Sequence, residues 1–148
     1  MGDSTLPEDI EGLIRSQKLA VLATRGEEYP YGTLVGFAFS DDFGFLYFAT
    51  SRDTRKFANI RRDPKVSLLI DSRSNSVDDF KDAGALTALG EAQEIRGKER
   101  ELHAGRYLRR HPHLGDFIGD PNTALVRVTV SRYILVRRFQ EVMELDLT

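Results

Sequence analysis

Three short apolar segments, separated by compact polar turns, follow one another near the start of this chain and restrict the folds that it can adopt. They cover residues 19–24, 31–40 and 45–49, and they are rich in the β-branched and aromatic residues that favour strands. The turn between the last two, Asp41-Asp42-Phe43-Gly44, has the length and composition of a hairpin turn. The sequence therefore predicts three consecutive antiparallel strands.

Further strands are predicted where the sequence alternates or runs apolar for a few residues, at 65–71, 85–95, 124–130 and 133–138. Six or seven strands with short turns and few helices, in a chain of 148 residues, fit one domain spanning 1–148. The predicted fold is mainly β with peripheral helices, a six- to seven-stranded antiparallel β-barrel that is closed or partly closed.

Three helices are expected around this barrel. The first lies within residues 1–18 and has Ile10, Leu13 and Ile14 on its apolar face, and the second is short and follows Thr50 directly. The third covers 97–110, with Leu102 and Leu108 interpreted as its apolar anchors. The polar segment 72–84 has no sustained period, so it is predicted to be an exposed loop that borders a pocket.

The composition argues against several classes of partner and site. With 21 basic and 23 acidic residues the chain has no excess charge to attract nucleic acid or an anionic membrane, and no apolar run approaches the roughly 20 residues that span a bilayer. The absence of cysteine excludes thiol and zinc–thiolate chemistry, and with the polar, acidic N-terminus it favours a cytoplasmic protein. His103, His111 and His113 lack a complementary carboxylate set, so they are interpreted as surface residues and no metal is expected.

Two segments, 68–70 and 124–126, are apolar on both faces of a predicted strand. In a monomeric barrel one face of each would stay in water, whereas a second copy of the chain would cover it. The sequence therefore predicts a homodimer.

The segment 50–56 joins the third strand to the short helix and concentrates groups that bind anions. Ser51 and Thr54 bring hydroxyls, and Arg55 and Lys56 stand in the first helical turn, where peptide N–H groups lack helical partners. This pattern predicts a site for the phosphate of a ligand. The alternative, in which Ser51 or Asp53 only caps the helix and the two cations are solvated, stays open on the local pattern alone.

Gly36 interrupts the second strand of the meander. Glycine inside a strand either permits a β-bulge or leaves room for a ligand or another backbone, and the bulge is the more common reason. Gly90, in the predicted strand 85–95, is also interpreted as the mark of a bulge.

Taken together, residues 30–39, 44–50, 54–56 and 61–68 resemble the pyridoxamine 5'-phosphate oxidase-like family of FMN-binding split barrels in their order and spacing. The resemblance implies that FMN lies between two protomers and that the partner's loop 72–84 adds to each site. It also implies that Arg55 and Lys56 contact the phosphate and that residues 33–36 run along the flavin ring. The implied cofactor-binding residues are Thr33, Leu34, Val35, Gly36, Ala49, Thr50, Ser51, Thr54, Arg55 and Lys56.

The chain departs from the vitamin B6 oxidases of this family in two places. Gly84-Ala85 stand where those enzymes have an Arg-Gln pair, and the chain contains no tryptophan to match their C-terminal segment. Residues 105–112 are more similar to the haem-utilisation branch. Pyridoxamine phosphate is therefore not the expected substrate.

The resemblance implies an FMN-dependent oxidoreductase that acts on an unidentified small molecule. No catalytic residue is assigned, because in a flavoprotein the cofactor carries the redox chemistry. Three alternatives remain open: a non-enzymatic flavin carrier, a haem-binding or haem-degrading protein, and a protein that uses F420 in place of FMN.

Overall fold

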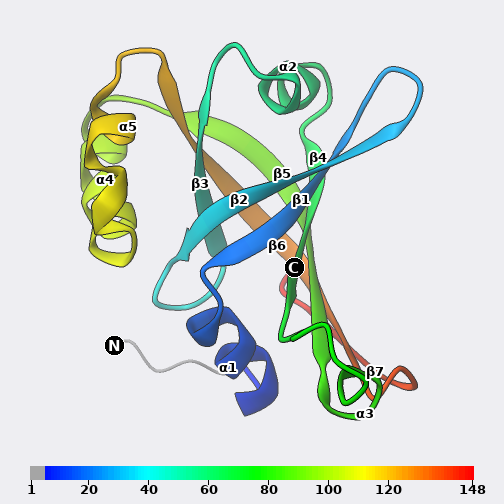
Figure 1. Cartoon of the computed structure of the whole chain (residues 1–148). Coiled ribbons are helices and arrows are strands. Elements are labelled where there is room, and N and C mark those ends of the chain that lie inside the picture. Colours follow the sequence, from blue (N-terminus) through cyan, green and yellow to red (C-terminus); the bar gives the residue numbers. More distant parts are fainter. Residues whose placement is uncertain (1–5) are drawn as a thin grey trace.

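Seven antiparallel strands make up the sheet in the computed structural model, in which residues 6–148 are described (Figure 1). Their bounds are β1 Leu19–Arg25, β2 Pro30–Phe39, β3 Phe45–Ser51, β4 Lys65–Asp71, β5 Gly84–Ile95, β6 Thr123–Arg137 and β7 Glu141–Asp146. The strand order is β3-β2-β1-β4-β5-β6-β7, and an additional pairing of β3 with β6 closes six strands into a barrel. The predicted fold class, a mainly β antiparallel split barrel, is confirmed.

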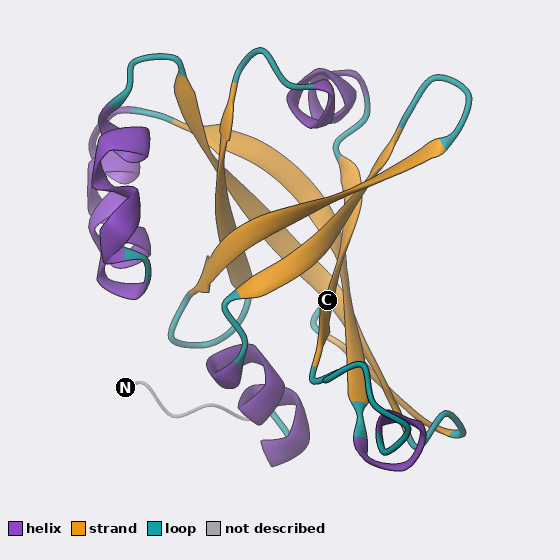
Figure 2. Ribbon diagram, in the orientation of Figure 1, coloured by secondary structure: helices purple, strands orange, loops and turns teal. Residues whose placement is uncertain are grey.

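The helices lie at the periphery of the barrel (Figure 2). They are α1 Glu8–Ser16, α2 Arg55–Arg62, α3 Asp79–Asp82, α4 Gly97–Arg110 and α5 Gly115–Gly119, with a 3₁₀ helix, η1, at Pro112–Leu114. Residues 1–5 of the helix expected within 1–18 lie outside the described residues. The segment 72–84 is not wholly a loop, because it contains α3, which follows a turn in which the Asp79 carboxylate accepts the peptide N–H groups of Ser74 and Asn75.

The core has two parts. One fills the barrel, and the other lies between the outer face of β2, β3 and β6 and the helices α4 and α5, where Tyr47, Tyr107 and Leu125 pack together. Leu125 is completely buried there. The expectation that 124–126 needs a second copy to cover it is therefore wrong, since α4 and α5 of the same chain cover this segment.

The C-terminal region differs from its prediction as two strands. Residues 123–137 form the single strand β6, and the predicted break at Ser131 is a β-bulge, where the register with β5 shifts between Leu89 and Gly90. A side chain at Gly90 would place its Cβ 2.3 Å from the Thr129 carbonyl oxygen, so the bulge expected at Gly90 is confirmed with a steric reason. Residues 141–146, beyond the last predicted strand, pair with β6 as β7.

The buried face of helix α4 is not the one predicted from its two leucines. Leu102 is 69% exposed, whereas Ala104 and Tyr107 are buried and Leu108 is partly buried against the outer core cluster. The buried positions follow the three- and four-residue spacing of a helix face, and Leu102 does not share that face with them.

The barrel is split between β2 and β3. These strands pair only from Phe37–Phe48 to Phe39–Leu46, so residues 30–36 pair with β1 alone and residues 49–51 pair with β6 alone. Figure 1 shows the two strands diverging toward the end of the barrel where α2 lies. The register of β2 with β1 is continuous through Gly36, so the bulge expected there is absent.

Candidate functional site

The turn from β3 into α2 is held by its own hydroxyl groups. Thr54 caps α2 by accepting the Phe57 N–H, and its hydroxyl lies 2.8 Å from the Ser51 carbonyl oxygen and 2.8 Å from the Thr50 hydroxyl. Thr50 is buried. Both threonine hydroxyls are thus engaged inside the turn, where they fix the start of the helix.

Ser51 is placed differently. Its oxygen accepts the Asn122 side-chain amide at 3.0 Å and lies 3.4 Å from the Asp53 N–H, and neither contact uses the hydroxyl hydrogen. The same amide donates to the Asp53 carboxylate at 2.8 Å. Asn122 therefore braces the turn from a distant loop, and the Ser51 hydroxyl keeps a proton to donate.

The two cations at the start of α2 sit in different surroundings. Arg55 is exposed, lies over the Tyr31 ring of β2 at 5.5 Å, and borders a cavity of about 460 Å³ beside the β1–β2 hairpin. Lys56 is half-buried, and no carboxylate pairs with it within residues 6–148. Partial burial lowers the pKa of Lys56 below its ordinary value. An anion beside this ammonium group would offset that cost of desolvation.

Residues 33–36 lie on the free edge of β2. Thr33 and Val35 pair with Leu22 and Ala20 and share the inner face with them, whereas Leu34 is 64% exposed on the outer face. The Gly36 carbonyl points away from β1, toward Tyr107. Peptide groups in a strand alternate in direction with a period of two residues, so the N–H and C=O of Leu34 also point away from β1, toward the free edge. These residues therefore offer a ligand backbone groups and the Leu34 side chain.

Tyr107 on α4 lies at the split and was not among the predicted site residues. Its hydroxyl donates to the Gly36 carbonyl oxygen at 2.9 Å, and the Ala49 N–H of β3 faces the hydroxyl oxygen of Tyr107. Burial raises the pKa of Tyr107 to about 12, so the hydroxyl keeps its proton at neutral pH. In the sequence, the three-residue spacing of Ala104 and Tyr107 was the signal that could have placed Tyr107 on the buried face of this helix.

At Gly36 the strand has no bulge, and the space that a side chain would take is bordered by side chains of the same protein. A Cβ there would lie 3.3 Å from the Tyr107 hydroxyl and 3.3 Å from Cε1 of His111. The neighbours are therefore side chains, of Tyr107 on α4 and of His111 at its end, and not the second backbone that the sequence analysis considered.

The histidines are not all surface residues. His111 is 3% exposed, and its Nε2 lies 2.7 Å from the Phe37 carbonyl oxygen. His103 stacks on Tyr47, and its Nδ1 is buried without a hydrogen-bond partner in the described part of the chain, while His113 is exposed. The prediction is wrong for His111 because the end of α4 turns its ring against β2.

Arg110 also belongs to the interior framework. Its guanidinium donates to the Phe37 carbonyl at 3.0 Å and to Ile14 and Gln17, two of the carbonyls that end α1. A cation at a helix C-terminus complements both the helix dipole and the unpaired carbonyls. Arg110 therefore ties α4 to α1 and β2.

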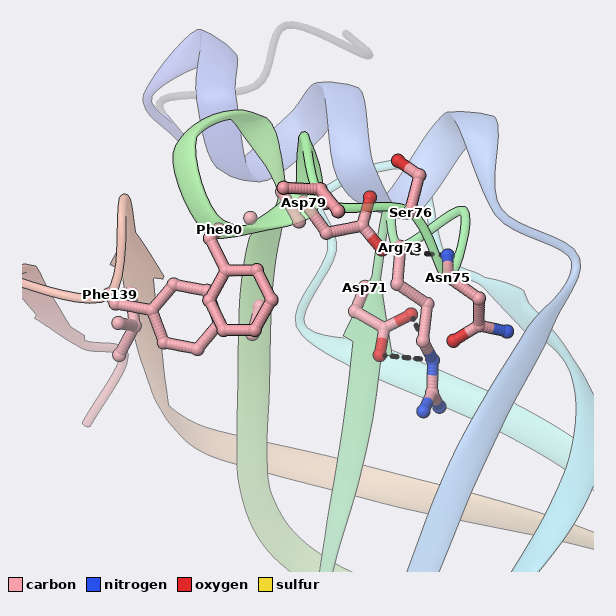
Figure 3. Close-up of a pocket in the computed structure, with 12 residues that line it drawn as sticks. Asp71, Arg73, Asn75, Ser76, Asp79, Phe80 and Phe139 are labelled. Atoms are coloured by element: carbon pink, nitrogen blue, oxygen red, sulfur yellow. Dashed lines mark hydrogen bonds and ion pairs between the residues drawn. The ribbon is translucent and has the colours of Figure 1, made fainter.

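The segment 72–84 borders a pocket of about 570 Å³ (Figure 3), as the sequence predicted. Phe80 and Phe139 stack at 5.2 Å on one side, and the Asp71–Arg73 ion pair lies on the other. Val77 and Phe80 are strongly exposed. None of the implied flavin-binding residues lines this pocket.

Within residues 6–148, no group of three histidine or acidic side chains is arranged to hold a metal ion. No helix in the same range is long and apolar enough to cross a membrane.

Solved structures similar to this one share its fold. A haem-binding protein from Mycobacterium smegmatis gives a TM-score of 0.81 at 19% identity, covering 96% of this chain and 59% of that one. ChuZ from Campylobacter jejuni gives 0.80 at 15% identity, with coverage of 95% and 58%. General stress protein 26 from Bacillus anthracis gives 0.71 at 23% identity, with coverage of 93% and 97%. The chain thus spans little more than half the length of the first two.

Comparison with curated protein sequences gives no significant match. The family model described as pyridoxamine 5'-phosphate oxidase, by contrast, matches residues 6–137, which include every strand of the closed barrel. The chain therefore belongs to the pyridoxamine 5'-phosphate oxidase family, as its sequence motifs suggested.

Proposed function

We propose that this protein binds FMN at the split of the barrel and acts as an FMN-dependent oxidoreductase on a small molecule. The observation that carries the proposal is Lys56, a half-buried ammonium group without a carboxylate partner in the described residues. It stands beside the first peptide N–H groups of α2, which a helix leaves unpaired. A phosphate is the group that these donors fit, and family membership supports a flavin as its carrier.

The proposed role of each residue follows from which of its hydrogen-bonding groups or charges is not already engaged within the protein. Arg55, Lys56 and the Ser51 hydroxyl hold the phosphate, while Thr50 and Thr54 shape the turn. The free edge of β2 from Thr33 to Gly36 offers peptide groups to the polar edge of the ring, and Ala49 lies beside it. When bound, the flavin supplies the transfer of electrons or hydride, so the chain needs no acid–base pair of its own.

Titration of the purified protein with FMN tests this site, with fluorescence and the visible spectrum as readouts. Replacing Arg55→Ala and Lys56→Ala together should weaken binding by about 1.5–3 kcal/mol, which is about tenfold to a hundredfold. The matched control is Arg61→Ala with Lys65→Ala, which removes equal charge from the other end of α2 and the start of β4. Equal affinity for both double variants, or no binding by the wild type, contradicts the proposal.

The proposal includes a homodimer. One cross-strand row on the outer face, Leu34–Val21–Leu69–Thr87–Ile134, crosses five strands, and each of these side chains keeps contact with solvent. A second copy would cover this row and bring its loop 72–84 to the flavin. Sedimentation should show a dimer that Leu69→Glu dissociates, with loss of FMN affinity. A wild-type chain that sediments as a monomer at micromolar concentration contradicts this part.

Turnover separates an oxidoreductase from a flavin carrier. Anaerobic bleaching of bound FMN by a donor, followed by return of the colour in air, supports an enzyme, whereas a flavin that no donor reduces faster than free FMN supports a carrier. Parallel titration with F420 identifies the preferred cofactor.

Haem binding is a second candidate, favoured by the haem-binding protein among the structural neighbours. His113 is the exposed histidine of the three in the chain, whereas Nε2 of His111 is engaged with Phe37. A Soret band on haem addition that His113→Ala abolishes would favour this function over flavin binding.

A further inference from the structure

The β2–β3 ladder stops where a tyrosine hydroxyl enters it. Three pairs form, the last joining Phe37 to Phe48, and continuing the same register would place Gly36 opposite Ala49. Ala38 pairs with Tyr47 of β3. Two residues further along each strand, Gly36 and Ala49 turn their peptide groups in the same directions as Ala38 and Tyr47, that is, toward each other. They should exchange the next ladder hydrogen bonds, but no such pairing forms.

The Tyr107 hydroxyl takes the place of that pairing. It donates to the Gly36 carbonyl oxygen at 2.9 Å and faces the Ala49 N–H, so each of these two groups meets the hydroxyl instead of the other. The tyrosine is 1% exposed, so water cannot easily substitute for it.

The position of this hydroxyl is fixed from both sides. Gly36 lacks the Cβ that would lie 3.3 Å from it, so the strand has room for the side chain. On the other side, Arg110 and His111 both bond the Phe37 carbonyl oxygen, at 3.0 and 2.7 Å. The end of α4 is thus anchored to the residue directly beyond the split.

We propose that Tyr107 is the wedge that holds β2 and β3 apart, and that it is a positioning residue for the flavin. This inference rests on the proposed function. If the ladder continued, Gly36 would pair with Ala49 and Leu34 with Ser51, and the groups offered to the flavin ring, which are the Gly36 N–H and the peptide groups of Leu34, would be consumed. The wedge keeps them free.

Two measurements on Tyr107→Phe test the inference. In the flavin-free protein, amide hydrogen exchange reports whether the Gly36 N–H becomes protected by pairing with Ala49. In the flavin titration, affinity should fall about tenfold, since edge groups used by the ring are lost. Tyr133→Phe is the matched control, because this buried tyrosine also donates to a carbonyl oxygen, that of Phe43 at 2.8 Å, away from the split. It should change neither reading.

Gly36→Ala serves as a second variant if Tyr107→Phe does not fold, because the added Cβ pushes the hydroxyl by a few tenths of an ångström while the tyrosine stays. It should change the exchange of residue 36 and the FMN affinity in the same direction as Tyr107→Phe, but less. Unchanged Gly36 exchange in the tyrosine variant overturns the wedge, and a protected Gly36 with unchanged FMN affinity overturns the positioning role. If the wild type binds no FMN, the proposed function and the positioning role fall together. The exchange measurement still decides the wedge.

Discussion

Two seams of the barrel, the junctions β5–β6 and β2–β3 between neighbouring strands, are built in opposite ways. β5 and β6 pair from Gly84–Arg137 to Ile95–Leu125, interrupted by one bulge, whereas β2 and β3 pair over three residues and then diverge. The first seam is closed by backbone hydrogen bonds. At the second, side chains of α4 and of His111 at its end bond the carbonyl groups of β2.

Each seam contains a glycine, and the two glycines show what the difference means. At Gly90 a Cβ would meet the Thr129 backbone at 2.3 Å, while at Gly36 it would meet side chains at 3.3 Å. Backbone in a continuous ladder cannot move aside, but side chains on a peripheral helix have some freedom to do so. The closed seam therefore fixes the barrel, and the split seam is the part that substitutions can reshape without unfolding it.

The largest expected effect is that of Gly90→Ala, which should lower the free energy of unfolding by about 3 kcal/mol or more, because the new methyl group collides with backbone. Gly36→Ala should cost about 1 kcal/mol, since Tyr107 and His111 can shift by a few tenths of an ångström. Urea unfolding measures both. Equal losses would remove the contrast between the seams.

An intermediate effect is expected for Arg110→Ala. This change removes the Arg110 donor from the carbonyls of Ile14 and Gln17 and leaves the Phe37 carbonyl with His111 alone, at a cost of about 2–3 kcal/mol. Its neighbour Arg109 is exposed, so Arg109→Ala should stay within about 0.5 kcal/mol. If thermal unfolding gave similar losses for the two, α4 would not be holding the split through Arg110.

The smallest effect concerns pH. Burial lowers the pKa of His111, although its hydrogen bond with Phe37 opposes the shift. The unfolded chain therefore takes up this proton first as the pH falls below about 6.5, and stability is lost from there down through the folded pKa. His111→Gln keeps a donor for Phe37 but does not titrate, so its Tm should fall less than that of the wild type between pH 7.5 and 5.5. His113→Gln, at an exposed position, is the control and should follow the wild type.

Local patterns in the sequence predicted most of the strands, but they predicted less well where a strand ends. The meander 19–49 and the bulge at Gly90 follow from periodicity and turn chemistry within a few residues. The cap of α2 does not, because Thr54 caps the helix and the local pattern pointed to Ser51 or Asp53. The break expected at Ser131 failed because a bulge and a turn use the same residue types, and which one forms depends on the partner strand.

The candidate site divides in the same way. Residues 50–56 are neighbours in sequence, so their hydroxyls and cations could be predicted to gather at one helix start. Sequence did not show that Thr50 and Thr54 bond each other, or that Asn122 braces the turn from another loop. These contacts depend on where distant segments meet.

By itself, the sequence determined strands β1 to β5, the helix start with its two cations and the family, because these rest on spacing along the chain. Only the tertiary structure decided where the barrel splits. Tyr107 lies 71 residues from Gly36, and no local pattern links them. The strands part there because α4 packs against β2 and β3 and inserts a hydroxyl where the next ladder bond would form.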